Sequence, residues 1–352
     1  DFGQSDAGLG VFYFVWALSA VAGSVVGGVA TERFGRRVVL PLAAFVHGLG
    51  LAMLGGAPTW VAFLVGAVPA GMGGGALDAG INGLFLDLYP SRRGNVLNGL
   101  HLFYSVGALG SPLVIGRLVE LGVAWQLVAL ATGLVAAVVA LSLLTVEMPS
   151  GRHARGSSAA LGGRARLFTL PLVALGAGIA FYVASEIGVS NWVVRFLSDA
   201  PLTVATSTLS LFWLGLAAGR LLAARFAHLI GAVAFTATCA ALSAVAIVGA
   251  VAAPTQPLSI ALFGLAGLAS GPTYPMIMGI GGSLYPGRSA AVSGFLTASA
   301  IAGALVYPPL MGFISVEIGI GAAMIGAGLV AFGCAGAVAL TGVLRARAAD
   351  AA

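Results

Sequence analysis

The sequence predicts an all-α polytopic membrane protein with eleven transmembrane helices. Of its 352 residues, 59% are hydrophobic and only 8% are charged, whereas a soluble domain carries about 25% charged residues. So few charges do not cover a soluble surface, which excludes an ordinary soluble enzyme, a secreted disulfide scaffold and a disordered tail. The apolar residues form long uninterrupted runs, whereas strands of a membrane β-barrel alternate over about ten residues.

Charged or Pro/Gly-rich breaks separate eleven apolar runs, each long enough for the ~20 apolar residues that a helix needs to cross a bilayer. We expect one helix from each run. The runs occupy residues 8–30, 38–57, 59–88, 95–119, 124–146, 167–198, 202–226, 229–252, 257–284, 290–316 and 320–344.

The basic residues predict the orientation of these helices. All sixteen are arginine, and if every run crosses the membrane, only Arg117 and Arg195 fall on the side opposite to the other fourteen. Cytoplasmic loops carry the excess of basic residues, so we expect a cytoplasmic C-terminus in a bacterial-type plasma membrane. The net charge of +5 follows from this bias, and we expect no nucleic-acid partner.

The chain divides into two halves that repeat. The polar, Arg-rich segment 147–166 separates an expected N-terminal bundle, 1–146, from a C-terminal bundle, 167–352. A shift of 196 residues aligns 88–116 with 284–312, and eleven of these 29 positions are identical. Duplicated halves are typical of secondary transporters, whose substrate site lies near the bilayer midplane between the repeats.

A second alignment predicts a twelfth helix. At a shift of 192 residues, Gly27 aligns with Gly219 and Arg33 with Arg225. The same shift carries the run 167–198 almost wholly to positions before Asp1. We therefore expect the natural protein to have twelve spans, of which the first is missing from this chain.

The loop after the first run has the pattern of a cytoplasmic gate. Small glycines allow close helix approach, and acidic and basic side chains in the loop can form charge-assisted contacts. The alternative interpretation is a simple basic loop on the cytoplasmic side. The gate residues that we predict in this loop are Gly28, Glu32, Arg33, Gly35, Arg36 and Arg37. We expect Asp87 to be their acidic partner, and Arg220 and Arg225 to be the corresponding residues of the second half.

This loop resembles the G-x-x-x-[DE]-R-x-G-R-[RK] signature of the major facilitator superfamily, and that resemblance implies two six-helix bundles, one incomplete here. Within the superfamily, the stretches 75–82, 93–108 and 181–192 resemble the fucose–galactose–glucose:proton symporters. That resemblance implies proton coupling and sugar binding at Asp78, followed by Asn82, with Asn98 and His101 where the group has an asparagine and a glutamine. The chain departs from the group at Gly83, where the permease has proline.

Two acids within apolar runs are candidate site residues on physical grounds alone. Asp78 lies deep in the run 59–88, and a carboxylate at the bilayer centre costs about 2.5–3.5 kcal/mol unless it is paired, hydrated or protonated. Glu186 is the second, with two alternative roles: lining a cavity or capping packed helices.

Other candidates accompany these acids. Near Glu186 are Asn191 and Trp192, and the tryptophan either stacks on a sugar ring or anchors at the membrane interface. Tyr274, which the repeat places opposite Asp78, lies between two prolines that interrupt its helix. At the equivalent position of the first half, we expect the glycine-rich segment Gly71–Gly75 to weaken the helix.

The sequence therefore predicts a monomeric secondary transporter that moves a small polar solute, in particular a monosaccharide, by proton-coupled alternating access. The alternatives are a proton-driven exporter of drugs or other lipophilic molecules and a sodium-coupled sugar carrier. No hydrolase or metalloprotease motif is present, so we expect no enzyme activity, no metal and no cofactor beyond the coupling proton. The expected partners are the small-molecule solute and the lipid bilayer.

Overall fold

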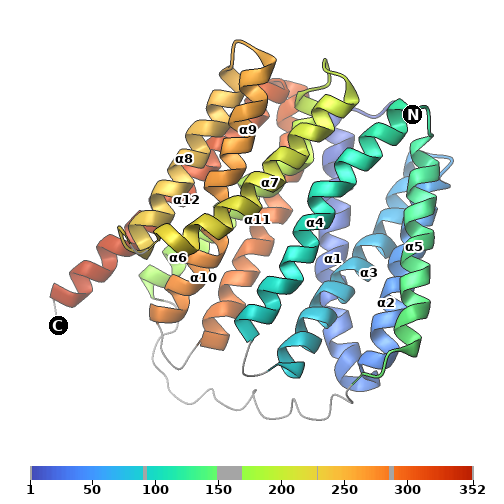
Figure 1. Ribbon diagram of the computed structural model, residues 1–352, viewed down its shortest axis with the longest axis horizontal. Coiled ribbons are helices and arrows are strands. Elements are labelled where there is room, and N and C mark those ends of the chain that lie inside the picture. The colour runs from blue at the N-terminus through green and yellow to red at the C-terminus, as the bar shows by residue number, and fades with distance from the viewer. Residues whose placement is uncertain (1, 90–92, 149–168, 228, 285–288, 351–352) are drawn as a thin grey trace. The chain divides into compact units, whose positions relative to one another are not determined.

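A computed structural model of the chain describes residues 2–89, 93–148, 169–227, 229–284 and 289–350, in which every regular element is a helix (Figure 1). The helices are α1 (Asp6–Phe34), α2 (Arg36–Gly55), α3 (Trp60–Leu88), α4 (Arg93–Glu120), α5 (Trp125–Thr145), α6 (Leu170–Phe196), α7 (Leu202–Phe226), α8 (Ala232–Ala252), α9 (Gln256–Ser270), α10 (Thr273–Leu284), α11 (Ser289–Glu317) and α12 (Ile320–Asp350).

The predicted all-α membrane fold is confirmed. Within the described residues, ten spans are long and apolar enough to cross a membrane, with α9 and α10 together forming one of them. The predicted run 95–119 is helical as well and corresponds to α4. The predicted cytoplasmic segment 147–166 lies almost entirely outside the described residues.

The run 257–284, expected to be one helix, is broken into α9 and α10. The break falls at Gly271 and Pro272, because a proline nitrogen has no hydrogen to donate to the carbonyl four residues earlier. The helix resumes where the Met276 amide donates to the Pro272 carbonyl. The matching glycine-rich segment of the first half behaves differently: α3 runs unbroken through Gly71–Gly75.

The chain forms two compact units, one made of Asp1–Gln4, Val11–Tyr104 and Leu118–Ala165, the other of Ser5–Gly10, Ser105–Arg117 and Arg166–Ala352. We call them unit 1 and unit 2. The first turn of α1 and the middle of α4 therefore group with unit 2. The bundle boundaries predicted from the sequence are not the same as these divisions, and they remain predictions.

Each unit has its own internal packing. In unit 1, α2 packs against α3 and α5. In unit 2, α8 packs in the same way against α9 and α12, while α6 packs against α11 and α12. The sequence repeat pairs α2 with α8, α3 with α9 and α5 with α12, so equivalent helices make equivalent contacts within each unit.

Glycines allow these helices to touch through their backbones. A Cβ added to Gly23 or Gly27 of α1 would collide with Met72 or Ala76 of α3, respectively. A Cβ added to Gly215 or Gly219 of α7 would collide with Gly264 or Leu268 of α9. The four glycines are the ones that the repeat aligns in pairs: Gly23 with Gly215, and Gly27 with Gly219. Gly71 and Gly75 of α3 likewise lie against the backbone of α1. These contacts support α3 at its glycine-rich segment, which stays helical.

Candidate functional site

Asp78 and Asn82 form a polar pair on α3. They lie one helical turn apart, and the Asn82 side-chain amide donates a 3.0 Å hydrogen bond to the Asp78 carboxylate. The Asp78 side chain is exposed on unit 1. The carbonyl oxygen of the Asn82 amide is buried and has no hydrogen-bond partner among the described residues. An exposed carboxylate and an unsatisfied amide oxygen can together bind a hydroxylated solute or a cation.

Three predicted site residues cannot be compared with this pair. The side chains of Asp87, Asn98 and His101 lie outside the residues whose surroundings the structure describes. Their predicted roles, as a gate partner for Asp87 and as solute ligands for Asn98 and His101, stay predictions.

Glu186 and Arg220 form the second polar site, in unit 2. The Glu186 carboxylate on α6 lies 4.0 Å from the Arg220 guanidinium on α7, and their side chains are 10% and 32% exposed. Arg220 also donates to the Gly271 carbonyl at the break between α9 and α10. The described contacts of Arg220 are thus within unit 2, and its predicted gate role stays a prediction.

Two tyrosines lie beside this ion pair. Tyr182 is one helical turn before Glu186, and its hydroxyl is close enough to Glu186 and Arg220 to interact with both electrostatically. The Tyr182 ring meets the Tyr274 ring with a centroid distance of 6.4 Å. The structure therefore brings together Glu186, Arg220 and Tyr274, three residues that the sequence analysis singled out separately, and adds Tyr182, which it missed.

Trp192 packs between helices in this structure, and its two predicted roles stay predictions. Its side chain is completely buried, and its indole N–H donates a 2.8 Å hydrogen bond to the Pro308 carbonyl on α11. Neither ring face is open to a solute or to the membrane interface in this arrangement. Its neighbour Asn191 is partly buried.

The predicted gate loop is a tight connection between α1 and α2. Gly35 caps α2 with a φ of +82°, a conformation that side chains disfavour. Arg36 donates to the Gly83 carbonyl of α3 over 3.3 Å. Gly28, Glu32, Arg33 and Arg37 are exposed, as is Arg225 at the end of α7. The gate role of this set stays a prediction.

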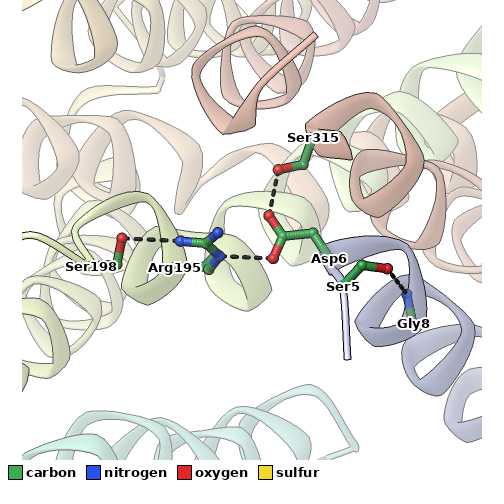
Figure 2. A network of polar contacts seen from close by, with 6 residues as sticks. All are labelled: Ser5, Asp6, Gly8, Arg195, Ser198 and Ser315. Carbon is green, nitrogen blue, oxygen red and sulfur yellow. Dashed lines mark hydrogen bonds and ion pairs between the residues drawn. The ribbon is translucent and has the colours of Figure 1, made fainter. Parts of the chain in front are cut away.

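A further polar network, shown in Figure 2, holds the first turn of α1 within unit 2. Asp6 accepts a 2.7 Å bond from Arg195 of α6 and a 2.6 Å bond from the Ser315 hydroxyl of α11. Arg195 also donates to Ser198. The sequence analysis missed Asp6. The signal that could have indicated it is Arg195, one of only two arginines predicted on the non-cytoplasmic side, for which an acidic partner could have been sought.

Comparison with known proteins places these sites in a family context. Residues 1–203 match the model of the Major Facilitator Superfamily. The MFS-type efflux transporter ffsH of Aspergillus flavipes is 33% identical over 94 residues, which are 26% of this chain and 17% of that protein. The MFS-type efflux pump elcC of Phaeosphaeria nodorum is 34% identical over 121 residues, 33% of this chain and 21% of that protein. The chain thus matches about a fifth of the length of these relatives.

Solved transporter structures share the fold at low identity. A bacterial homologue of the human lysosomal transporter Spinster, inward-facing and occupied, has a TM-score of 0.76 at 17% identity, covering 97% of this chain and 90% of that one. A D-xylose–proton symporter has a TM-score of 0.72 at 17% identity, covering 95% and 87%. The nucleoside transporter NupG has a TM-score of 0.76 at 13% identity, covering 97% and 92%.

Proposed function

The chain belongs to the Major Facilitator Superfamily, and from this premise we propose that it is a proton-coupled symporter of a small polar solute, with a monosaccharide as that solute. Members of the superfamily are transporters, and the ten apolar spans make the chain an integral membrane protein. The solute, the coupling ion and the direction of transport are the parts that we propose.

The Asp78–Asn82 pair carries the proposal. A carboxylate within an apolar span is expensive unless it is functional or paired, and Asp78 bonds only a neutral amide among the contacts described for it. Such a group changes its charge when it binds a proton, and its neighbouring amide offers both a donor and an acceptor to a hydroxylated solute. A change of charge alters the relative free energies of the two access states.

The other acid within an apolar span, Glu186, supports proton coupling as well. Glu186 is buried in unit 2, but its 4.0 Å separation from Arg220 is longer than a close, bidentate ion pair. We therefore assign Asp78 the role of proton carrier, and Glu186 and Tyr274 the role of polar groups near the transport path.

The test is uptake by the full-length protein in proteoliposomes. Labelled fucose, galactose and glucose are offered under an inward proton gradient to the wild type, to Asp78→Asn and to Asp199→Asn. Asp199 is the matched control, an exposed acid in the turn after α6. We expect gradient-driven uptake to disappear in Asp78→Asn while solute exchange at equal pH survives, and Asp199→Asn to behave as the wild type.

Two results would contradict the proposal. Folded wild-type protein that takes up none of the three sugars would remove the sugar assignment. Uptake that follows a sodium gradient and ignores a proton gradient would favour the sodium-coupled sugar carrier instead, because a carboxylate with an amide oxygen is also a suitable Na⁺ site.

A second candidate function is proton-driven export of drugs or other lipophilic molecules. The names of the two fungal relatives, an efflux transporter and an efflux pump, favour it. Export predicts proton-dependent accumulation of lipophilic dyes in vesicles that hold the protein in the inverted orientation. Polar groups such as Asp78 and Asn82 support a hydroxylated solute, which is why we rank symport first.

The distribution of arginine supports a cytoplasmic C-terminus in a bacterial plasma membrane. Arginines at the end of α1, at the start of α2 and in the last turns of α12 fall on the same predicted side. A green fluorescent protein fused to the C-terminus, which becomes fluorescent only in the cytoplasm, checks this orientation. We propose a monomer with the solute and the lipid bilayer as its partners.

A further inference from the structure

Unit 2 contains a small internal cavity with a polar wall. It has a volume of about 10 Å³ and is lined by residues of α6, α8, α9, α10 and α12 at the break between α9 and α10. Five of the residues around it carry hydroxyl groups: Tyr182 and Ser185 of α6, Ser243 of α8, Ser270 of α9 and Thr273 of α10. The rest of the wall is formed by small apolar or weakly polar side chains, among them Cys334.

Two of the hydroxyl groups have no hydrogen-bond partner among the described residues. Thr273 is completely buried and Tyr182 is 4% exposed, and the oxygen of each is inaccessible and unbonded. Ser243 and Ser270, in contrast, bond each other over 2.7 Å. A buried hydroxyl without a partner is costly, and such groups in native proteins are nearly always bonded to protein or to ordered water.

We propose that this cavity is a binding site for one ordered water molecule, held by the Tyr182 and Thr273 hydroxyls. Its volume is about that of the ~10–15 Å³ that a single buried water requires. A water bonded to both hydroxyls supplies the two partners that are missing, and the serine pair lies on the same wall to supply more.

The charges around the cavity favour water over a cation. No carboxylate lines it among the described residues, and Glu186, which follows the lining residue Ser185, pairs with Arg220. The other titratable side chains on the surrounding helices include the neutral groups Tyr182 of α6, Cys239 of α8, Tyr274 of α10 and Cys334 of α12, and the arginines Arg195 of α6 and Arg345 and Arg347 of α12. A site with neutral hydroxyls alone offers a metal ion no compensating charge, whereas it suits a neutral molecule that both donates and accepts.

The proposed water connects the Glu186–Arg220 pair to the break between α9 and α10. The Tyr182 hydroxyl interacts with Glu186, and the Tyr182 side chain lines the cavity. Thr273 is the first residue of α10. The water thus joins α6 to the start of α10, and it forms a hydrogen-bonded path that ends beside the Glu186 carboxyl.

The sign of a stability change tests the site. Thr273→Val and Tyr182→Phe each remove one hydroxyl and keep the shape of the side chain. If the cavity is dry, removing the unbonded Thr273 hydroxyl raises the melting temperature, so Thr273→Val is the decisive variant, whereas Tyr182→Phe also removes the electrostatic contact with Glu186 and Arg220. If water is bound, each variant loses a bond and melts lower, and the double variant melts higher than the sum of the two losses predicts, because both lose the same water.

The matched control is Ser259→Ala in α9. Its hydroxyl is also buried without a partner, but it does not line the cavity. We expect its melting temperature to be unchanged or higher. A rise in the melting temperature of Thr273→Val, or a fall of equal size in Ser259→Ala, overturns the proposal.

Two further measurements identify the ligand. Melting in sodium chloride and in choline chloride is expected to be the same, and a sodium-specific stabilisation that Thr273→Val abolishes would replace water by Na⁺. X-ray radiolysis creates hydroxyl radicals from bound water itself, so we expect oxidation of the buried Tyr182 and less of it in Thr273→Val. Equal oxidation of Tyr182 in the two proteins would contradict the site.

These measurements stand without the proposed transport activity. The functional consequence rests on that activity: Thr273→Val is expected to slow gradient-driven uptake and to leave exchange at equal pH unchanged. If melting and radiolysis give the expected results while Asp78→Asn retains gradient-driven uptake, the water site holds and the proposed role of Asp78 fails.

Discussion

The Glu186–Arg220 pair is asymmetric, because the acid is buried more deeply than the base. Glu186 is 10% exposed and Arg220 is 32% exposed. Removing one partner of a buried pair leaves the other charge uncompensated, at a cost of about 3–5 kcal/mol when that charge is fully buried. The cost is smaller when the remaining charge reaches water.

We therefore expect Arg220→Gln to destabilise the protein more than Glu186→Gln. The first leaves a buried carboxylate and should cost about 2–4 kcal/mol, scaled down from a fully buried pair. The second leaves a partly solvated guanidinium and should cost about 1 kcal/mol or less. Thermal unfolding in detergent, followed with a thiol-reactive dye on the buried Cys334, measures both.

The double variant is the control for this comparison. It should recover part of the stability lost in Arg220→Gln, because it contains no unpaired buried charge. The reverse order, with Glu186→Gln melting lower than Arg220→Gln, would show that the arginine and not the acid is the costly group of the pair.

At the residue scale, the sequence identified acids more readily than their partners. Asp78 and Glu186 stand out because ionisable groups are rare in apolar runs. Arg220 sits near the end of a run, and its alignment with the loop motif suggested a gate, although its long side chain reaches inward to Glu186. The buried Trp192 bonds the carbonyl of Pro308, 116 residues away, and no local pattern encodes that contact.

Helices in this protein approach each other at positions where a side chain is absent. In unit 2, Gly303 of α11 lies against the Ala180 backbone of α6, and an added Cβ would collide with it. Gly294, in the same helix, faces open space. These two glycines separate the effect of close packing from the intrinsic effect of glycine in a helix.

Gly303→Ala is therefore expected to force α6 and α11 apart and to lower the melting temperature, at a cost of about 1–3 kcal/mol typical of overpacking. Gly294→Ala should be neutral or stabilising by up to about 1 kcal/mol, because alanine is the better helix former. Melting curves of the two variants provide the comparison. Equal losses would mean that flexibility, and not contact, is what Gly303 contributes.

At the element scale, the sequence predicted the helices well and their interruptions poorly. Continuous apolar runs mark the spans because lipid tolerates no unpaired backbone. Both Gly71–Gly75 and the Gly271–Pro275 segment looked like weak points, yet only the second breaks its helix. The difference is chemical: Pro272 removes a donor, whereas the α3 glycines keep theirs and are braced by α1.

At the scale of the whole molecule, the chain passes from unit 2 into unit 1 within α1. Ser5–Gly10 belongs to unit 2 and α1 continues into unit 1 from Val11. The Asp6 network is what holds the first turn. Its Ser315 bond is buried, whereas Arg195 is 46% exposed, so water screens the ion pair.

Asp6→Ala should release this first turn without unfolding the rest of α1. The Leu9 amide bonds the Ser5 carbonyl, and we expect its hydrogen exchange to rise about 5–30-fold, as for a loss of about 1–2 kcal/mol. Arg195→Gln should have a smaller effect. Exchange measured by mass spectrometry distinguishes them, with Asp199→Asn as the control. Faster exchange along all of α1 in Asp6→Ala would contradict a local role.

The two-fold repeat was visible in the sequence, and it reappears as equivalent helix contacts within each unit. The division of α1 and α4 between the units was not visible, because it depends on which neighbours their ends contact and not on their own composition. The surroundings of the Asp87 side chain are outside the described part of the structure, so its predicted role as a gate partner stays a prediction.

The backbone contacts of the glycines also determine which positions of this sequence can accept substitutions during evolution. Where helices meet through main-chain atoms, the fold depends on a few small residues at fixed spacing and places little demand on the identity of the bulky residues that face outward. Substitutions among Leu, Val, Ile and Phe at those outward positions should then cost little stability. A chain built in this way can lose most of its resemblance to its relatives while its helices keep their arrangement, so the spacing of Gly23, Gly27, Gly215 and Gly219 is a better guide to distant kinship than overall identity.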